Sequence, residues 1–439
     1  MQPIDNLIHG GWIVPVEPEG VVLENHAIAI RDGIIVSVLP YREAEQRYQP
    51  KELDSFPHHV LIPGLVNAHT HAAMTLFRGI ASDLPLMPWL HDHIWPAETR
   101  WVSKGFVHDG TALAAAEMLR GGVTCFNDMY FFPDEAARAV VSAGIRAVLG
   151  LIVLDFPTVW ARNGEEYIAR ARDMHDQLRQ EPLLRTALAP HAPYSVSNGS
   201  LEQVGILADE FDVPIHMHVH ETEDEIDHSL EQHKERPMNR MARLGLLSPR
   251  LLAVHMTHVD RNDLTAFAAS GASVAHCPES NLKLASGVCP VERLVEAGVM
   301  VAMGTDGCAS NDDLDMLGEM RTATLLAKGA ANSARALPVA QVLTMATLHG
   351  ARALGLGDVI GSLVAGKAAD IVAIDLRAIE TQPVYNPLSQ LVYSTNRQQV
   401  TDVWVAGQQV LRERVLITLD EDELIDKAKV WGTKIAGSM

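Results

Sequence analysis

The sequence predicts an α/β fold in which eight strand–helix repeats close into a barrel and the two chain ends together form a small β domain. Eight short apolar, β-branched runs alternate with longer stretches rich in Ala, Leu and Glu, which is the pattern of parallel strands joined by helical crossovers. Short alternating segments occur at both ends of the chain. At 439 residues, the chain is long enough for one large domain and a smaller one.

The eight predicted barrel strands are 61–67, 123–129, 146–153, 185–190, 213–219, 251–256, 272–275 and 300–304. In such barrels the chemistry lies just beyond the C-terminal ends of the strands. The polar residues that follow these strands are therefore the candidates for function.

The two chain ends read as short strands and turns. Residues 27–31 and 34–38 flank Asp32-Gly33, and residues 399–405 and 408–411 flank Ala406-Gly407, both of which are hairpin signals. A further strand is expected at 370–374, and the spacing over 421–435 predicts a closing helix. The expected division is a composite β domain from 1–58 and 362–420, a barrel from 59–361, and a C-terminal helix from 421–439.

Charge and cysteine content narrow the class of protein. A formal charge of −20 repels phosphate backbones and anionic lipid, so neither a nucleic acid polymer nor a membrane is expected as partner, and a small molecule is. The four cysteines form no CxxC pair and are expected to be reduced and buried. The N-terminal segment lacks the basic and apolar regions of a signal peptide, which predicts a cytoplasmic protein.

The first predicted strand ends in a histidine pair. His69 and His71 are separated by one residue, so alternation along an extended chain points both imidazoles to one side. Such pairs are often only polar surface residues. Here the pair follows a buried strand, where unpaired polar groups are costly, and a role as metal ligands explains it better.

The fifth and eighth strands supply further candidates. His216, His218 and His220 alternate on one face, and only one of them is needed as a third ligand. We choose His218, because Glu221, three residues later, can then act as an acid or base beside the metal; the other two histidines are interpreted as hydrogen-bonded wall. Asp306 follows the eighth strand, where it is a fourth ligand or the base that holds the water.

The chain contains, in this order, LIPGLVNAHTH, HMHVHET, LLAVHMTH, HCPESNLKL, MGTDG and GSLVAGKAADIVAIDL. These motifs resemble the amidohydrolase superfamily over nearly the whole chain, and within it most closely the methylthioadenosine/S-adenosylhomocysteine deaminases. The resemblance implies a distorted (β/α)₈ TIM-like barrel with a small β-sandwich built from both chain ends, in agreement with the strand pattern.

The resemblance also implies a metal site and its neighbours. It gives Glu221 and His255 as catalytic neighbours of one divalent metal whose ligands are His69, His71, His218 and Asp306. Binuclear members use a lysine near the fourth strand to bridge two metals, and residues 188–193 contain none, so we predict one ion. Three nitrogens and one oxygen suit Zn²⁺, and Fe²⁺ accepts similar ligands.

The implied reaction is hydrolytic deamination of the adenine ring of 5′-methylthioadenosine, S-adenosylhomocysteine or adenosine, giving the inosine counterpart and ammonia. In this hypothesis the metal lowers the pKa of its bound water from about 15.7 toward 7. Asp306 accepts the proton, and the metal-bound hydroxide attacks C6 of the purine. Glu221 delivers a proton to N1, and His255 steadies the new oxygen.

Substrate contacts are expected in the long segment 74–100, which could cover a ligand as a lid. The resemblance to the deaminases implies that Trp89 flanks the ligand; otherwise it packs against the barrel. It also implies that Glu98 accepts hydrogen bonds from the ribose 2′ and 3′ hydroxyls; otherwise Glu98 is a solvated surface charge. His191, after the fourth strand, would contact the nucleoside in the same resemblance.

A homocysteine tail would need an arginine, and Arg138, Arg146 and Arg162 all remain open. A second group of residues past strands six and seven either lines the pocket or satisfies backbone groups: His258, Ser280, Asn281 and Lys283.

Two alternatives remain. Another hydrolase of the superfamily, such as a guanine deaminase or a triazine chlorohydrolase, would keep the metal ligands, and an essential Glu98 would argue against it because those rings carry no ribose. A non-catalytic assembly or binding protein of this fold would have lost ligands, and this chain retains them. A homo-oligomer is possible because such enzymes commonly pair.

Overall fold

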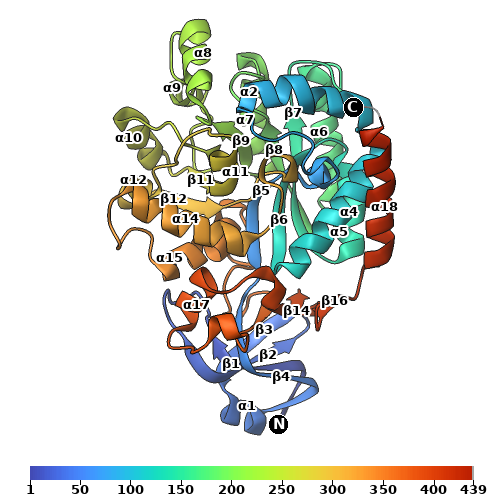
Figure 1. Ribbon diagram of the computed structural model, residues 1–439, viewed down its shortest axis with the longest axis vertical. Coiled ribbons are helices and arrows are strands. Elements are labelled where there is room, and N and C mark those ends of the chain that lie inside the picture. Colours follow the sequence, from blue (N-terminus) through green and yellow to red (C-terminus); the bar gives the residue numbers. More distant parts are fainter. Residues whose placement is uncertain (438–439) are drawn as a thin grey trace.

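The computed structural model describes residues 1–437, and their strands form two sheets (Figure 1). One sheet has eight strands in the order β12-β11-β10-β9-β8-β7-β6-β5, all paired in parallel. The other joins strands from both chain ends in the order β16-β15-β14-β13-β4-β1-β2-β3. The architecture confirms the predicted barrel and the predicted composite β domain.

The barrel strands are almost wholly buried, because helices cover the outside and side chains fill the inside. They are β5 (Leu65–Thr70), β6 (Val123–Tyr130), β7 (Arg146–Val153), β8 (Leu184–Pro190), β9 (Ile215–Val219), β10 (Leu251–His255), β11 (Ser273–His276) and β12 (Met300–Met303).

The first barrel strand differs from its prediction. Residues 61–63 belong to β4 (Tyr48–Pro63), a strand of the other sheet, and β5 begins only at Leu65. Between them, Gly64 approaches Thr124 so closely that a Cβ would lie 1.8 Å from its hydroxyl oxygen. The continuous apolar run from 60 to 66 hides this change of sheet, because both strands are buried.

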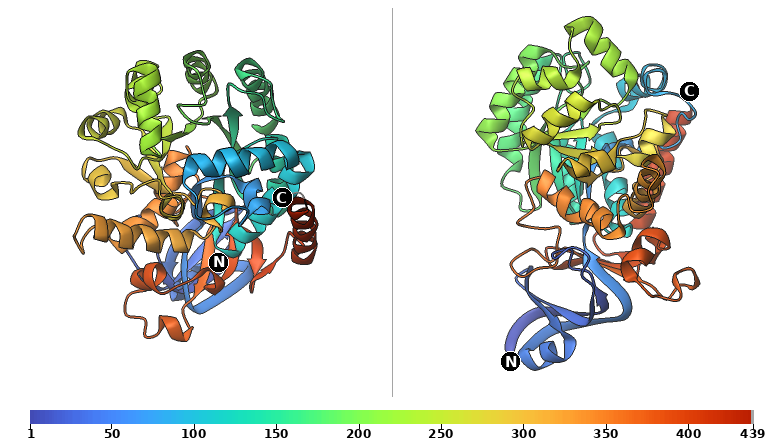
Figure 2. Two further views of the ribbon diagram at one scale, coloured as in Figure 1. Left: turned by 45° about the horizontal axis from the view of Figure 1, so that its top comes forward. Right: turned by 90° about the vertical axis from the view of Figure 1, so that its left-hand side faces the viewer.

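The crossover helices surround the barrel (Figure 2). In chain order they are α4 (Lys104–Arg120), α5 (Pro133–Ala143), α6 (Gly164–Leu178), α7 (Asn198–Phe211), α8 (Glu223–His233), α9 (Pro237–Arg243), α10 (Arg261–Ser270), α11 (Pro278–Lys283), α12 (Val291–Glu296), α13 (Cys308–Asn311), α14 (Met316–Ala330), α15 (Val339–Thr344), η3 (Met345–His349) and α16 (Gly350–Ala353).

Four short helices after β5 lie over the C-terminal ends of the barrel strands, on the side away from the β domain (Figure 1). They are η1 (Ala72–Phe77), α2 (Leu86–Trp89), η2 (Leu90–Ile94) and α3 (Trp95–Trp101). This is the segment that the sequence suggested as a lid.

The β domain contains β1 (Gln2–Ile13), β2 (Leu23–Arg31), β3 (Ile34–Pro40), β4, β13 (Ile371–Asp375), β14 (Val400–Val405), β15 (Gln408–Arg412) and β16 (Val415–Leu416). Strand β4 joins the two chain ends, since it pairs with β1 on one side and with β13 on the other. Both predicted hairpins form, and their turn residues have positive φ. Short helices α1 (Tyr41–Arg47), η4 (Ile379–Thr381), α17 (Pro387–Tyr393) and η5 (Arg397–Gln399) complete this part.

Helix α18 (Glu421–Ala436) closes the chain and packs beside α4 (Figure 1). The last two residues of the predicted 421–439 helix lie outside the described residues. The predicted boundary at residue 58 falls within β4, which continues to Pro63. The sheet of the β domain therefore extends past the first predicted boundary. The division of the chain into domains stays a prediction.

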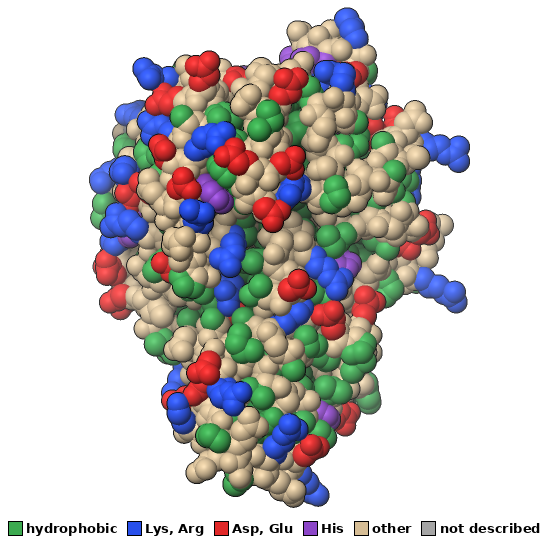
Figure 3. All heavy atoms as spheres, turned by 180° about the vertical axis from the view of Figure 1, so that it is seen from behind, with side chains coloured by type: hydrophobic (Ala, Val, Ile, Leu, Met, Phe, Trp, Pro, Cys, Tyr) green, Lys and Arg blue, Asp and Glu red, His purple; other side chains and the backbone are tan. Residues whose placement is uncertain are grey.

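The described surface is mixed in charge. On the face shown in Figure 3, acidic and basic side chains are interspersed. None of the helices in residues 1–437 is both long and apolar enough to cross a membrane. All four cysteines are buried and unpaired, as the sequence predicts.

A buried ion pair links the barrel to the β domain. The guanidinium of Arg146, at the start of β7, donates two hydrogen bonds to Asp370, from Nε at 2.8 Å and from Nη2 at 3.1 Å. Both side chains are less than a tenth exposed. Asp370 also accepts from the backbone N–H of Ala406, at 2.7 Å. Removing one partner would leave the other charge buried and unpaired.

We predict that Arg146→Leu lowers the free energy of unfolding by about 3–5 kcal/mol, measured by denaturant unfolding of the metal-loaded chain. Arg162→Leu is the matched control, because Arg162 pairs with Glu166 but its side chain is 85% exposed, and it should leave stability unchanged within error. Equal stability of both variants would show that the buried pair does not hold the two parts together.

Candidate active site

Five side chains that the sequence singled out converge at the C-terminal end of the barrel. His69 lies in β5 and His71 just after it, His218 lies in β9, His255 ends β10, and Asp306 follows β12. Nε2 of His69 and Nε2 of His71 lie 3.2 and 3.3 Å from Oδ1 of Asp306. Two triads share His69, one with His218 and His255 and one with His71 and Asp306, and within each triad the ligand atoms lie within 4.8 Å of one another.

The outer nitrogen of each imidazole in this cluster is already bonded. Oxygen acceptors fix Nδ1 as the protonated nitrogen of three rings and leave Nε2, with its lone pair, directed at the cluster. The Nδ1 partners are the carbonyl of Met129 for His71 at 2.6 Å, the carbonyl of His191 for His218 at 2.7 Å, and Oδ1 of Asn281 for His255 at 2.8 Å.

His216 and His220 lie behind the cluster rather than in it. Nε2 of His216 is 2.8 Å from Nδ1 of His69. The Nδ1 atom of His69 therefore also has a hydrogen-bond partner, like those of His71, His218 and His255. Nε2 of His220 accepts the backbone N–H of Met238 at 3.2 Å. These contacts agree with the interpretation of both residues as wall.

Asp306 is held by three donors. The backbone N–H of Gly307 bonds Oδ1 at 2.8 Å, and the hydroxyls of Ser280 and Ser310 bond Oδ2 at 2.6 and 2.8 Å. Burial alone would raise the pKa of Asp306, but the imidazoles of His69 and His71 outweigh it and hold the pKa well below its ordinary value. The carboxylate is therefore ionised and fixed in direction.

This donor set fits a divalent metal. Neutral imidazole nitrogens with their second nitrogens bonded, beside one oriented carboxylate, are the combination that Zn²⁺ and similar ions accept. Burial depresses the pKa of His69 to about 4 and that of His218 well below its ordinary value. At His71 the Asp306 carboxylate outweighs burial and raises the pKa to about 9, so a metal ion would have to replace a proton on Nε2 of that ring. The described residues therefore form a histidine-rich site that can hold a metal ion.

Glu221 stands beside this site as a protonated acid. Its side chain is buried, and its Oε2 lies 3.7 Å from Nε2 of His255. Burial and the neighbouring charge of Asp306 raise the pKa of Glu221 to about 8. The carboxyl group thus carries a proton at neutral pH and can donate it to a ligand in the pocket.

The backbone that carries Glu221 is held by Glu225, in the first turn of α8. The carboxylate of Glu225 accepts hydrogen bonds from the backbone N–H groups of His220 and Glu221, both at 2.9 Å. The backbone of His220 is in the left-handed region, with a φ of 56°, which is uncommon for a residue other than glycine. Sequence reasoning missed Glu225. The only signal was a carboxylate four residues after Glu221, and acidic residues are common in the first turn of any helix.

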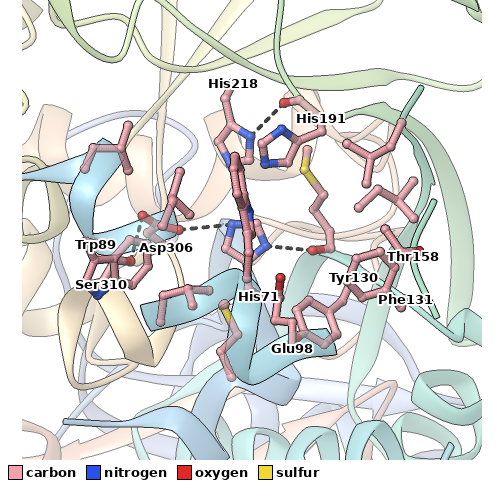
Figure 4. Close-up of a pocket in the computed structure, with 18 of the residues that line it drawn as sticks. His71, Trp89, Glu98, Tyr130, Phe131, Thr158, His191, His218, Asp306 and Ser310 are labelled. Carbon is pink, nitrogen blue, oxygen red and sulfur yellow. Dashed lines mark hydrogen bonds and ion pairs between the residues drawn. The ribbon is translucent and has the colours of Figure 1, made fainter. Parts of the chain in front are cut away.

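A pocket of about 540 Å³ opens over the cluster, and Trp89, Glu98 and His191 all line it (Figure 4). Burial raises the pKa of Glu98 to about 7, although its side chain keeps some contact with solvent in the pocket. Nδ1 of His191 is 2.9 Å from the hydroxyl of Ser195. Trp89 is buried, and its indole N–H has no partner among the described residues.

The remaining candidates lie elsewhere. Among the residues past strands six and seven, Ser280 bonds Asp306 and Asn281 bonds His255, so they support the cluster from behind. His258 reaches the carbonyl of Ser286 at 2.7 Å, and Lys283 pairs with Asp312. Sequence reasoning missed Ser310, which lines the pocket and bonds Asp306.

Comparison with known proteins decides the family. A model of the amidohydrolase family matches residues 60–410. The 5-methylthioadenosine/S-adenosylhomocysteine deaminase of Saccharophagus degradans is 47% identical over 99% of this chain and 97% of its own length. The chain belongs to the amidohydrolase family. The family resemblance that the sequence motifs indicated is thereby confirmed.

Two further relatives of this amidohydrolase are informative. The 5′-deoxyadenosine deaminase of Methanothermobacter thermautotrophicus is 43% identical, covering 86% of this chain and 88% of that protein. A crystal structure of an adenosine deaminase from Xanthomonas campestris, with bound zinc, is 53% identical, covers 99% of both chains and has a TM-score of 0.98.

A glycine lets the last barrel strand of this amidohydrolase approach the first. A Cβ on Gly304 would lie 2.9 Å from the backbone nitrogen of His69 and 3.0 Å from its Cβ. Contacts this short force a shift, and the neighbour that would shift is the segment carrying a candidate ligand.

We predict that Gly304→Ala weakens metal retention at least about tenfold, because a displaced imidazole loses its supported orientation. Metal content after dialysis against a graded chelator series measures the effect. Gly205→Ala, in α7, is the matched control, since nothing lies within 4 Å of the added carbon, and alanine favours a helix. Unchanged retention in Gly304→Ala would contradict the role of this close approach.

Proposed function

We propose that this amidohydrolase binds one divalent metal and hydrolytically removes the 6-amino group from the adenine ring of a small purine nucleoside. The observation that carries the proposal is the placement of a protonated Glu221 beside the ligand cluster and in the same pocket as Glu98. The relatives named as deaminases of adenine nucleosides support this assignment.

The proposed ligands are His69, His71, His218 and Asp306, and the proposed ion is zinc, with Fe²⁺ as the alternative. Zinc in the 53% identical structure supports the first choice. When bound, such an ion supplies Lewis acidity that makes water a nucleophile near neutral pH. The end of β8 carries His191 rather than a lysine, which supports a single ion.

The protein's own groups then move the protons. Glu221 donates its proton to N1 of the purine, which makes C6 accept the oxygen of water more readily. Asp306, ionised and held by two serine hydroxyls, accepts a proton from the water. His255 steadies the oxygen that joins C6. Asp306 passes the proton it accepted to the amino group, the C6–N bond breaks and ammonia leaves. The hydroxyl on C6 gives its proton to Glu221, which restores the acid and leaves a carbonyl on the ring.

Other pocket residues orient the nucleoside. Glu98 accepts hydrogen bonds from the two ribose hydroxyls, because one carboxylate matches a vicinal diol. His191 contacts the nucleoside through Nε2, since its Nδ1 is occupied by Ser195. Trp89, which lines the pocket, flanks the ligand.

We predict that Glu221→Gln keeps one equivalent of metal while kcat for adenosine falls by about 10²–10⁴-fold or more. Gln has nearly the shape of Glu but cannot deliver the proton. Elemental analysis gives the metal content, and loss of adenosine absorbance gives the rate. A variant with full activity would remove Glu221 from the proposed mechanism.

The role of Glu98 separates a nucleoside deaminase from a hydrolase of another ring. We predict that Glu98→Ala lowers kcat/KM for adenosine by about 10²-fold, the loss expected for hydrogen bonds to a charged group. The matched substrate is 2′,3′-dideoxyadenosine, which lacks the diol and should react equally with both proteins. A silent Glu98→Ala would favour a guanine deaminase or triazine chlorohydrolase instead.

A further inference from the structure

None of the described residues that line the pocket is a lysine or an arginine. Among the described residues that line it, the acids are Glu98, Glu221 and Asp306, and the only basic groups are histidines of the cluster and His191. A carboxylate entering this pocket would find no lysine or arginine to pair with among the described lining residues.

The part of the pocket remote from the proposed metal is apolar. Figure 4 shows Tyr130, Phe131 and Thr158 on the side away from Asp306 and Ser310. This side is built from the ends of β6 and β7 and the loop that follows, while Asp306 follows β12. Apolar side chains form most of this wall, including Phe131, Ile152, Leu154, Phe156 and Val159.

None of the arginines that the sequence left open is among the described residues that line this pocket. Arg146 lies at the opposite end of β7, roughly 20 Å along the strand, and is bonded to Asp370. Arg138 bonds Glu135 at 2.7 Å, and its side chain is 69% exposed. Arg162 bonds Glu166 at 2.8 Å. Each would have to leave a carboxylate partner before it could bind a carboxylate of a substrate.

We propose that the pocket selects adenine nucleosides whose 5′ substituent is uncharged and apolar, such as an alkylthio group, and discriminates against an amino-acid tail. The inference rests on the proposed function. With the ring at the metal cluster and the ribose at Glu98, the 5′ substituent extends toward the apolar wall. An apolar substituent gains burial there, whereas a carboxylate would be desolvated without a partner.

The test compares kcat/KM of the zinc-loaded full chain for four nucleosides: adenosine, 5′-methylthioadenosine, 5′-butylthioadenosine and S-adenosylhomocysteine. The butylthio compound is the matched control, because its tail is of similar length but neutral. We expect methylthioadenosine to exceed adenosine by about tenfold or more, butylthioadenosine to stay within about tenfold of it, and S-adenosylhomocysteine to fall at least about 10²-fold below butylthioadenosine.

A pair of variants tests the cause. Val159 lines the pocket and is 41% exposed, whereas Val141, on α5, is 43% exposed and is not among the lining residues. Val159→Arg should raise the ratio of kcat/KM for S-adenosylhomocysteine to that for butylthioadenosine by about tenfold. Val141→Arg should leave this ratio unchanged.

The outcomes are distinct. If S-adenosylhomocysteine matches butylthioadenosine, or if both are poor to the same degree, charge does not govern selection and the inference is overturned. An unchanged ratio in Val159→Arg overturns it as well. If adenosine and methylthioadenosine are both inert while zinc is bound, the proposed function fails instead.

Discussion

Closure of the barrel between its first and last strands is the constraint on which the site depends. Both polar atoms of the Asn67 side chain bond Thr305, one to its hydroxyl at 2.7 Å and one to its backbone N–H at 3.0 Å. The backbone N–H of Asp306 then donates to the carbonyl of His69 at 3.0 Å. These buried groups must bond one another because water does not reach them. The closed arrangement therefore brings the candidate ligands at the end of the first strand, His69 and His71, next to Asp306 after the last strand.

Burial gives the groups at this junction their chemical states. In a site without bulk water, an imidazole prefers to be neutral and a carboxyl group prefers its proton, unless an opposite charge lies beside it. Burial and the charge of Asp306 raise the pKa of Glu221, which stays protonated, whereas the imidazoles of His69 and His71 lower the pKa of Asp306, which stays ionised. The same enclosure therefore supplies metal ligands, an acid and a base within one pocket.

The same physics connects the mechanism to selection of the substrate. A low-dielectric pocket that keeps Glu221 protonated also makes any unpaired charge on a ligand expensive. Arg146 does not line this pocket. It joins β7 to Asp370 of the β domain instead. Stability and catalysis thus use separate ends of the same strands, with the ion pair at the start of β7 and the pocket beyond its end.

The sequence by itself determined the repeating strands, the alternation that points His69 and His71 to one side, and Asp306 at a strand end, because these depend on neighbouring residues and on the period of a strand. It could not separate β4 from β5 at Gly64, where two buried strands read as one run. Only the tertiary structure decided that Ser310 and Glu225 support the site, that His255 lies within ligand distance of His69, and that no arginine lines the described pocket. Those facts are distances between residues far apart in the chain, and local periodicity carries no information about them.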